Sequence, residues 1–203
     1  PVSTDPVNYE ASHEALQLSD EDRSYVQAWL SDAFPAGFDG LSHEQIVFQI
    51  YQKIMSGEFT YVADIGDQWE SMTQFLTSKT GDCEEFSHLL YSAIDVAFAS
   101  LPELEKPSMT VLAGLVGSGA QVFGHSLVEI TLNDVHYAFD LTGSIAPASL
   151  LEDVATLDEY TREYSFEELI RYDNIQTTLN VESSALRNFS TSSSIDDTLD
   201  DTL

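Results

Sequence analysis

The 203-residue sequence is poor in positive charge. Seven lysines and arginines stand against 35 aspartates and glutamates, which gives a formal net charge of −28 at pH 7. Phosphate backbones and anionic membrane surfaces would repel such a chain, which argues against nucleic-acid binding. Because salt or divalent cations screen self-repulsion among carboxylates, we expect an extracellular, cell-surface or periplasmic location in a saline or calcium-rich environment.

The sequence also has little cysteine and no long apolar run. Its one cysteine, Cys83, cannot form an internal disulfide or build a thiolate zinc site. No stretch approaches the roughly 20 apolar residues of a membrane span, and the start at Pro1 lacks the zones of a signal peptide. We therefore expect no direct membrane insertion. The 43% apolar content is enough to fill one core.

The composition divides the chain into three parts. Residues 1–18 are expected to form an extended lead-in, residues 19–181 one domain, and residues 182–203 a tail or linker rich in Ser, Thr and Asp. Within the domain, helical spacing of apolar residues and capping signals predict four helices and one short strand before residue 107. The helices are expected from Ser19-Asp20, from Ser42 to Gly57, over 69–76 and from Asp82 to about residue 100, and the strand at 59–62.

Beyond Pro107 the pattern changes to that of β-strands. Strands are predicted at 109–115, 122–132 and 135–141, with Asn133-Asp134 as the turn of a hairpin. Helical spacing returns at 150–154 and 166–172, and a last strand is predicted at 177–181. The fold class is therefore α+β, with N-terminal helices and a central helix packed on an antiparallel sheet.

Cys83 is the first candidate for chemistry. Gly81 breaks one helix, Asp82 caps the next, and Cys83 then occupies the first helical position. Unpaired backbone N–H groups and the positive end of the helix dipole stabilise a thiolate there, as a nucleophile requires. The alternative is an inert small hydrophobe at a helix start.

The hairpin supplies a candidate base and a group to orient it. With the turn centred on Asn133-Asp134, Asp140 faces Leu127, which points to the same side as His125. His125 and Asp140 are then diagonal neighbours on one face. Asp140 would hold one ring nitrogen while the other faces Cys83, if the core helix packs against that face.

The remaining histidines test this choice. His13 and His43 are expected at the solvated surface, and His88 lies on the Cys83 helix at a poor angle for contact, partly buried or exposed. His136 shares the face of Asp140 and is the rival base.

Three motifs in the order Cys, His, Asp carry a family resemblance. Trp69-Glu70-Ser71-Met72, Phe75-Leu76 and Gly81-Asp82-Cys83-Glu84-Glu85-Phe86 resemble the nucleophile segment of the transglutaminase-like superfamily. Gly124-His125-Ser126-Leu127-Val128-Glu129-Ile130 resembles its histidine strand, and Tyr137-Ala138-Phe139-Asp140-Leu141-Thr142 its aspartate strand. The nearest likeness is to bacterial transglutaminase-like cysteine proteinases of the LapG type, which include a periplasmic protease that releases biofilm adhesins.

The resemblance implies a transglutaminase-like or papain-like core in which Cys83, His125 and Asp140 form a catalytic triad. It also implies calcium held by the acidic residues that flank the nucleophile, here Asp82, Glu84 and Glu85, although Glu85 stands where the family usually has Asp. Three carboxylates beside a thiol should raise its pKa, and a bound cation would remove that conflict. The alternative is a capping box of Asp82 and Glu85 without a metal.

The oxyanion of an acyl-transfer reaction needs two donors. The backbone N–H of Cys83 is one, the resemblance offers the Trp69 region as the second, and the side-chain amide of Gln68 is a further candidate. Trp69 could equally be a core anchor.

Together these features predict a cysteine protease or amide hydrolase that acts on a protein or peptide substrate, with a surface adhesin as one candidate. The chemistry requires no cofactor, and calcium is a candidate ligand. Two alternatives stay open: a cross-linking transglutaminase, in which a lysine amine resolves the acyl-enzyme, and a non-catalytic transglutaminase-like module of an extracellular surface assembly.

Overall fold

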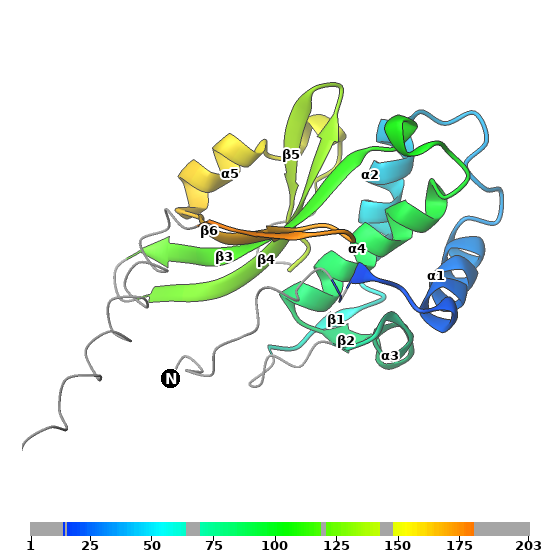
Figure 1. Ribbon diagram of the computed structural model, residues 1–203, viewed down its shortest axis with the longest axis horizontal. Helices are drawn as coiled ribbons and strands as arrows, with labels where there is room; N and C mark the ends of the chain where they lie inside the picture. The colour runs from blue at the N-terminus through cyan, green and yellow to red at the C-terminus, as the bar shows by residue number, and fades with distance from the viewer. Residues whose placement is uncertain (1–13, 15, 64–69, 119–120, 143–147, 181–203) are drawn as a thin grey trace, which may run out of the picture.

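The computed structural model describes residues 14, 16–63, 70–118, 121–142 and 148–180 (Figure 1). Helices and a five-stranded antiparallel sheet make up these residues, as the α+β prediction requires. In chain order the elements are α1 (Asp20–Ala33), α2 (His43–Ile54), β1 (Thr60–Tyr61), α3 (Met72–Ser78), β2 (Thr80–Gly81), α4 (Cys83–Ala97), η2 (Glu103–Glu105), β3 (Ser108–Ser118), β4 (Gln121–Leu132), β5 (Val135–Phe139), η3 (Leu151–Asp153), α5 (Leu157–Tyr164), β6 (Glu167–Tyr172) and β7 (Thr177–Leu179).

Capping residues set the starts of the helices. The Ser19 side chain accepts a hydrogen bond from the N–H of Asp22 and begins α1, and Ser42 and Gln45 form the predicted capping box of α2. The helix predicted over 69–76 begins at Met72 instead, because Ser71 caps it. A cap therefore locates these N-termini more closely than apolar spacing does.

The strand order of the sheet is β5-β4-β3-β6-β7. Leu132 pairs with Val135 across a two-residue turn in which Asn133 and Asp134 have positive φ angles of 49° and 63°. Asn and Asp tolerate this left-handed conformation, which matches the twist of a hairpin. The register is the predicted one, so alternate residues of β4 and β5 share a face.

The two faces of the sheet are covered by different helices. Helix α4 packs on β3 and β4, and the core on that side contains Val128, Ile130 and Phe139 together with residues of α1, α2 and α4. A smaller cluster on the other face joins Leu127 to Tyr160 of α5. Figure 1 shows α5 and α4 on opposite sides of the strands.

Two predictions for the C-terminal part are wrong. Residues 167–172 form strand β6 rather than a helix, and α5 at 157–164 has no counterpart among the predicted helices. Phe166 and Ile170 are both buried, but the β-bulge that shifts the β3–β6 register between Ala113 and Gly114 turns them to opposite faces of the sheet. Phe166 joins the cluster beneath α5, and Ile170 joins the main core. The segment predicted as a helix at 150–154 is the short 3-10 helix η3.

Of the helices in the described residues, none has the length and apolar character required to span a bilayer. The division into 1–18, 19–181 and 182–203 stays a prediction, since most of the lead-in and the whole tail lie outside the described residues.

Candidate active site

Helix α4 begins at Cys83, as predicted. The Asp82 side chain accepts from the N–H of Glu84, and the Glu85 side chain accepts from the N–H of Asp82, which completes a capping box. Only 6% of Cys83 is exposed. The thiol therefore lies at a helix N-terminus, beneath the surface.

Gly81 allows the chain to approach α4 closely enough for this start. A Cβ at Gly81 would lie 2.8 Å from the Cβ of Glu85 and 2.9 Å from the ring of Phe75. Both neighbours are buried, so they could not move away at little cost. Gly81 also pairs with Tyr61 in the parallel β1–β2 bridge, which brings the Tyr61 ring toward the site.

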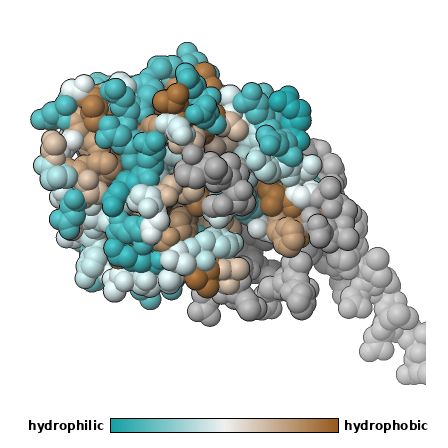
Figure 2. Space-filling model, turned by 180° about the vertical axis from the view of Figure 1, so that it is seen from behind, coloured by the Kyte–Doolittle hydropathy of each residue, from teal (hydrophilic) through white to brown (hydrophobic). Residues whose placement is uncertain are grey.

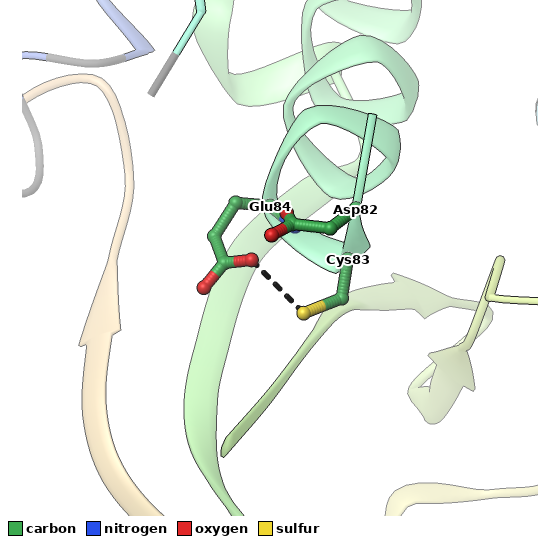
Figure 3. Close-up of side chains that lie close together, drawn as sticks. All are labelled: Asp82, Cys83 and Glu84. Atoms are coloured by element: carbon green, nitrogen blue, oxygen red, sulfur yellow. Dashed lines mark hydrogen bonds between the residues drawn. The ribbon is translucent and has the colours of Figure 1, made fainter. Parts of the chain in front are cut away.

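The Cys83 sulfur has two polar neighbours. Its S–H donates to Oε2 of Glu84 at 2.9 Å, the contact drawn in Figure 3, and the backbone N–H of Ser126 donates to the sulfur. Burial, followed by the negative charges of Glu84 and Asp82, raises the pKa of the thiol well above its ordinary value. In this arrangement the thiol is protonated at neutral pH, and the neighbouring carboxylates outweigh the effect of the helix end.

Asp82 and Glu84 are two neighbouring carboxylates beside Cys83. Among the described residues, no lysine or arginine forms an ion pair with either of them. Burial, then the hydrogen bond and charge of Glu84, raise the pKa of Asp82 to about 7. One carboxylate oxygen of each residue and the Cys83 sulfur lie within 4.8 Å of one another. Carboxylate oxygens are ligands that calcium accepts, so the donor chemistry of Asp82 and Glu84 fits this ion.

Glu85 does not join that cluster. Its two carboxylate oxygens accept from the N–H groups of Glu70 and Asp82, each at 3.1 Å, and the residue is 4% exposed. Of the three predicted calcium ligands, the structure therefore brings together Asp82 and Glu84, while Glu85 holds the backbone on either side of α3.

His125 and Asp140 are the diagonal neighbours that the hairpin register predicts. Nε2 of His125 lies 3.0 Å from Oδ2 of Asp140, and both side chains are largely buried. This contact leaves Nδ1 as the ring nitrogen that can exchange a proton with a nucleophile.

Asp140 is held by three further donors. The N–H and hydroxyl of Thr142 donate to Oδ1 at 3.0 Å and 2.8 Å, and the hydroxyl of Tyr160 donates to Oδ2 at 2.8 Å. Burial raises the pKa of the Asp140 carboxyl, but the hydrogen bond and charge of His125 and the bonds from Thr142 and Tyr160 together lower it to about 2. Asp140 is therefore a fixed anion that orients His125.

The expectation that α4 packs against the face bearing His125 is wrong. The α4 face of the sheet carries Val128 and Ile130, whereas His125 lies on the face of Leu127, which α5 covers. Cys83 approaches from the edge of β4 instead, where its sulfur meets the N–H of Ser126, the residue next to His125. No hydrogen bond joins Cys83 to His125 in this structure, because the S–H is bonded to Glu84.

The other predicted residues lie elsewhere. His136, the rival base, is exposed and bonds Glu129 at 2.6 Å through Nδ1. His88 is fully buried, against the expectation, and its Nε2 contacts the hydroxyl of Tyr172 at 2.9 Å; burial lowers its pKa to about 4. His43 is exposed and packs edge-on against Phe98.

The predicted oxyanion donors Trp69 and Gln68, as well as His13, lie outside the described residues. Tyr160 and Thr142, which support Asp140, were not predicted from the sequence. An Asp followed two residues later by Thr is the signal of a local side-chain turn and could have identified Thr142. No pattern in the sequence connects Tyr160 to Asp140.

The fold is similar to those of three solved structures of Legionella pneumophila LapG. One has a TM-score of 0.53 at 13% sequence identity and covers 89% of this chain and 91% of that chain. An EGTA-treated form has a TM-score of 0.52 at 15% identity, covering 84% of each chain, and a calcium-bound form has 0.52 at 15%, covering 87% and 95%. The sequence itself matches no family model and no curated protein. The chain has a transglutaminase-like fold, as predicted.

Proposed function

We propose that the chain is a cysteine hydrolase that cleaves amide bonds in a protein or peptide, with Cys83, His125 and Asp140 as its triad. The observation that carries the proposal is the buried His125–Asp140 pair at 3.0 Å, placed beside the strand residue whose N–H meets the Cys83 sulfur. The transglutaminase-like fold supports it. So does the chemistry of an oriented base next to a thiol.

In the proposed reaction, Nδ1 of His125 takes the thiol proton and the Cys83 sulfur attacks the carbonyl carbon. The tetrahedral oxyanion is stabilised by the Cys83 N–H at the start of α4. Its collapse breaks the C–N bond, and the imidazolium gives its proton to the departing amine. A water molecule, deprotonated by His125, then hydrolyses the thioester and regenerates the thiol. Asp140 stays ionised throughout and keeps the ring oriented.

The resting contact between Cys83 and Glu84 opposes this reaction, because a protonated thiol bonded to a carboxylate is a poor nucleophile. Calcium held by Asp82 and Glu84 would neutralise both carboxylates and thereby lower the pKa of the thiol. The calcium-bound and EGTA-treated forms of LapG support this part of the proposal. If a chelator lowers the melting temperature of the wild type but not that of Asp82→Asn/Glu84→Gln, the result supports a calcium site. If the chelator changes neither melting temperature, the calcium site is excluded.

An acyl-transfer assay tests the triad without knowledge of the natural substrate. p-Nitrophenyl acetate should acetylate Cys83, which mass spectrometry detects, and release of p-nitrophenol should continue as water resolves the thioester. Cys83→Ser should abolish the reaction, and His125→Gln should slow it by at least about 100-fold, since a general base contributes that much. His136→Gln is the matched control, because that exposed histidine contacts Glu129 instead, and it should react as the wild type does.

Amine capture of the acetyl group and iodoacetamide alkylation of Cys83 separate the alternative functions. If a labelled primary amine captures the acetyl group faster than water does, the chain is a transferase of the cross-linking kind. If iodoacetamide modifies Cys83 only after unfolding, the buried thiol is structural and the domain is a non-catalytic module. A secreted or periplasmic location with a surface protein as substrate remains part of the proposal, supported by the net charge of −28.

A further inference from the structure

Strand β4 has an open edge beside the candidate active site. Strand β5 pairs only with residues 128–132 of β4, whereas β3 pairs with all of β4 from Gln121 onward. In Figure 1 the β3–β4 hairpin extends past β5. Among the described residues, no strand pairs with residues 121–127 on the β5 side. The outer edge of β5 is covered instead, because the N–H of Ala138 donates to Ala155.

The hairpin register determines which backbone groups face the open edge. Leu132 and Val135 close the two-residue turn as a hydrogen-bonded pair, so the even-numbered residues of β4 direct their N–H and C=O toward β5. Beyond Val128 the same alternation turns Ser126, Gly124 and Val122 outward. The Ser126 N–H confirms this direction, because it reaches the Cys83 sulfur.

Gly124 is the residue nearest the thiol whose edge-facing groups have no partner among the described residues. It lies two residues from Ser126, and two residues of a strand span about 7 Å. A Cβ built at Gly124 would meet nothing within 4 Å, so the sheet face is open at this residue and an Ala fits there without a clash. An extended chain hydrogen-bonded to Gly124 would thus bring its next carbonyl to the Cys83 sulfur.

Apolar side chains flank this edge. Val122 and Phe123 are 40% and 64% exposed, and Tyr61, whose pKa is raised to about 12 by burial and then by the charges of Cys83 and Asp82, is 44% exposed. Figure 2 shows one face of the molecule, on which hydrophobic residues are interspersed with hydrophilic ones. Exposed apolar residues beside unpaired strand backbone are the two features that β-strand addition uses.

We infer that this edge binds an extended, non-acidic segment of the protein substrate as an added β-strand, with Gly124 supplying main-chain hydrogen bonds that place the scissile carbonyl at Cys83. The inference rests on the proposed hydrolase function. A second copy of this chain is the less favourable occupant, because two molecules of net charge −28 repel one another. The acidic pair Asp82 and Glu84 likewise disfavours an acidic segment.

The test uses acetyl-Val-Ala-Val-Ala with a C-terminal vinyl methyl sulfone as a probe of the edge. The Cys83 sulfur adds to the vinyl carbon attached to the peptide, which is β to the sulfone. The carbon that bears the sulfone takes a proton from the imidazolium of His125, and no group leaves. Methyl vinyl sulfone, which lacks the peptide, measures the thiol alone. Probes with one N-methyl group at each amide in turn complete the series, and the alkylation rate of Cys83 is followed by mass spectrometry.

On the wild type, the peptide probe should react at least about tenfold faster than methyl vinyl sulfone, as one or two hydrogen bonds of about 1 kcal/mol allow. N-methylation should lower the alkylation rate about tenfold at alternate amides of the probe and less than about threefold at the amides between them, because only alternate amides face the edge of β4. A probe with Lys in place of the central Ala should react faster than one with Glu.

Gly124→Pro removes the edge-facing N–H. In this variant the alkylation rate with the peptide probe, divided by the rate with methyl vinyl sulfone, should fall toward one. Gly124→Ala keeps the N–H in open space and should retain the ratio. Fast methyl vinyl sulfone reaction without any peptide preference or alternation would overturn the inference and leave the triad standing. A thiol inert to both reagents would remove the hydrolase proposal and this inference with it. A dimer in sedimentation that Gly124→Pro dissociates would assign the edge to a second copy and overturn the inference.

Discussion

Replacing Glu84 with glutamine should lower the pKa of the Cys83 thiol. The Glu84 carboxylate accepts the S–H at 2.9 Å, so its charge favours the protonated thiol, while burial and Asp82 act in the same direction. Glutamine keeps the size of the side chain and removes the charge. The effect is expected in chelator, where no cation neutralises the carboxylate.

The geometry sets the magnitude. Two unit charges about 3 Å apart repel by about 1.4 kcal/mol in bulk water and by about 5.5 kcal/mol at an effective dielectric of 20. Glu84 is half-buried, which favours the lower part of this range. Since one pKa unit corresponds to about 1.4 kcal/mol, we expect the pKa to fall by at least about one unit. The thiolate fraction then rises about tenfold, but its intrinsic nucleophilicity falls about threefold, so the rate at a fixed neutral pH rises only about threefold.

The assay is the rate of iodoacetamide alkylation of Cys83 between about pH 6 and pH 10, because at a pH below the thiol pKa this rate is proportional to the thiolate fraction. Glu105→Gln is the control, since Glu105 follows the opposite end of α4 from Cys83. Its profile should coincide with that of the wild type. An unchanged or lower alkylation rate for Glu84→Gln across this pH range would refute the electrostatic account of the thiol.

Three further perturbations follow from the described contacts. Tyr160→Phe removes a 2.8 Å hydrogen bond to Asp140 and should lower the free energy of unfolding by about 1 kcal/mol in urea titrations. An unchanged free energy of unfolding would mean that this hydrogen bond is no more favourable than hydration of the hydroxyl in the unfolded state. The pKa of Asp82 is raised to about 7, so the folded state binds a proton more tightly than the unfolded state, and stability should fall as pH rises from about 4 to 7. Asp82→Asn retains the cap and should flatten this slope in chelator. Gly114→Ala places a Cβ in a clash with the backbone carbonyl oxygen of Glu167, so the variant should be destabilised by about 3 kcal/mol or be insoluble, and a wild-type melting temperature would contradict the bulge geometry.

The parts of the fold that follow from local rules were predictable. Ser19 and Ser42 begin helices because their side chains satisfy free N–H groups, and Asn133-Asp134 forms a two-residue turn because both residues tolerate positive φ. The turn fixes the register, and the register brings His125 to Asp140. The adjacency of this pair was therefore accessible from the sequence, whereas its catalytic role stays a prediction.

The parts that depend on tertiary packing were not predictable. Phe166 and Ile170 are four residues apart, a spacing that fits one face of a helix and one face of a regular strand equally well. The bulge between Ala113 and Gly114 then turns them to opposite faces of the sheet, which no local pattern indicates. Helix α5 has 8 residues, and its apolar positions Leu157, Tyr160 and Tyr164 recur at helical spacing among charged residues. Over so short a segment this pattern is a weak signal. Long-range packing likewise decides which helix covers which face of the sheet. The expectation that α4 packs on the face of His125 was wrong, because α4 covers the opposite face.

That difference has a consequence for how a substrate strand could bind. Because α4 lies on the opposite face from His125, the Cys83 sulfur lies at the edge of β4 and occupies the edge-facing N–H of Ser126. An added strand can therefore pair with Val122 and Gly124 but must leave the ladder before Ser126, so its reactive carbon has to follow the last paired residue directly. Strand pairing can shift only in steps of two residues. One extra residue between the Val-Ala-Val-Ala segment and the vinyl sulfone should therefore misplace the reactive carbon and lower the alkylation rate about tenfold, whereas two extra residues should restore the rate. We expect the loss for one inserted residue and its recovery for two, and equal rates for both lengths would show that the edge does not set the register.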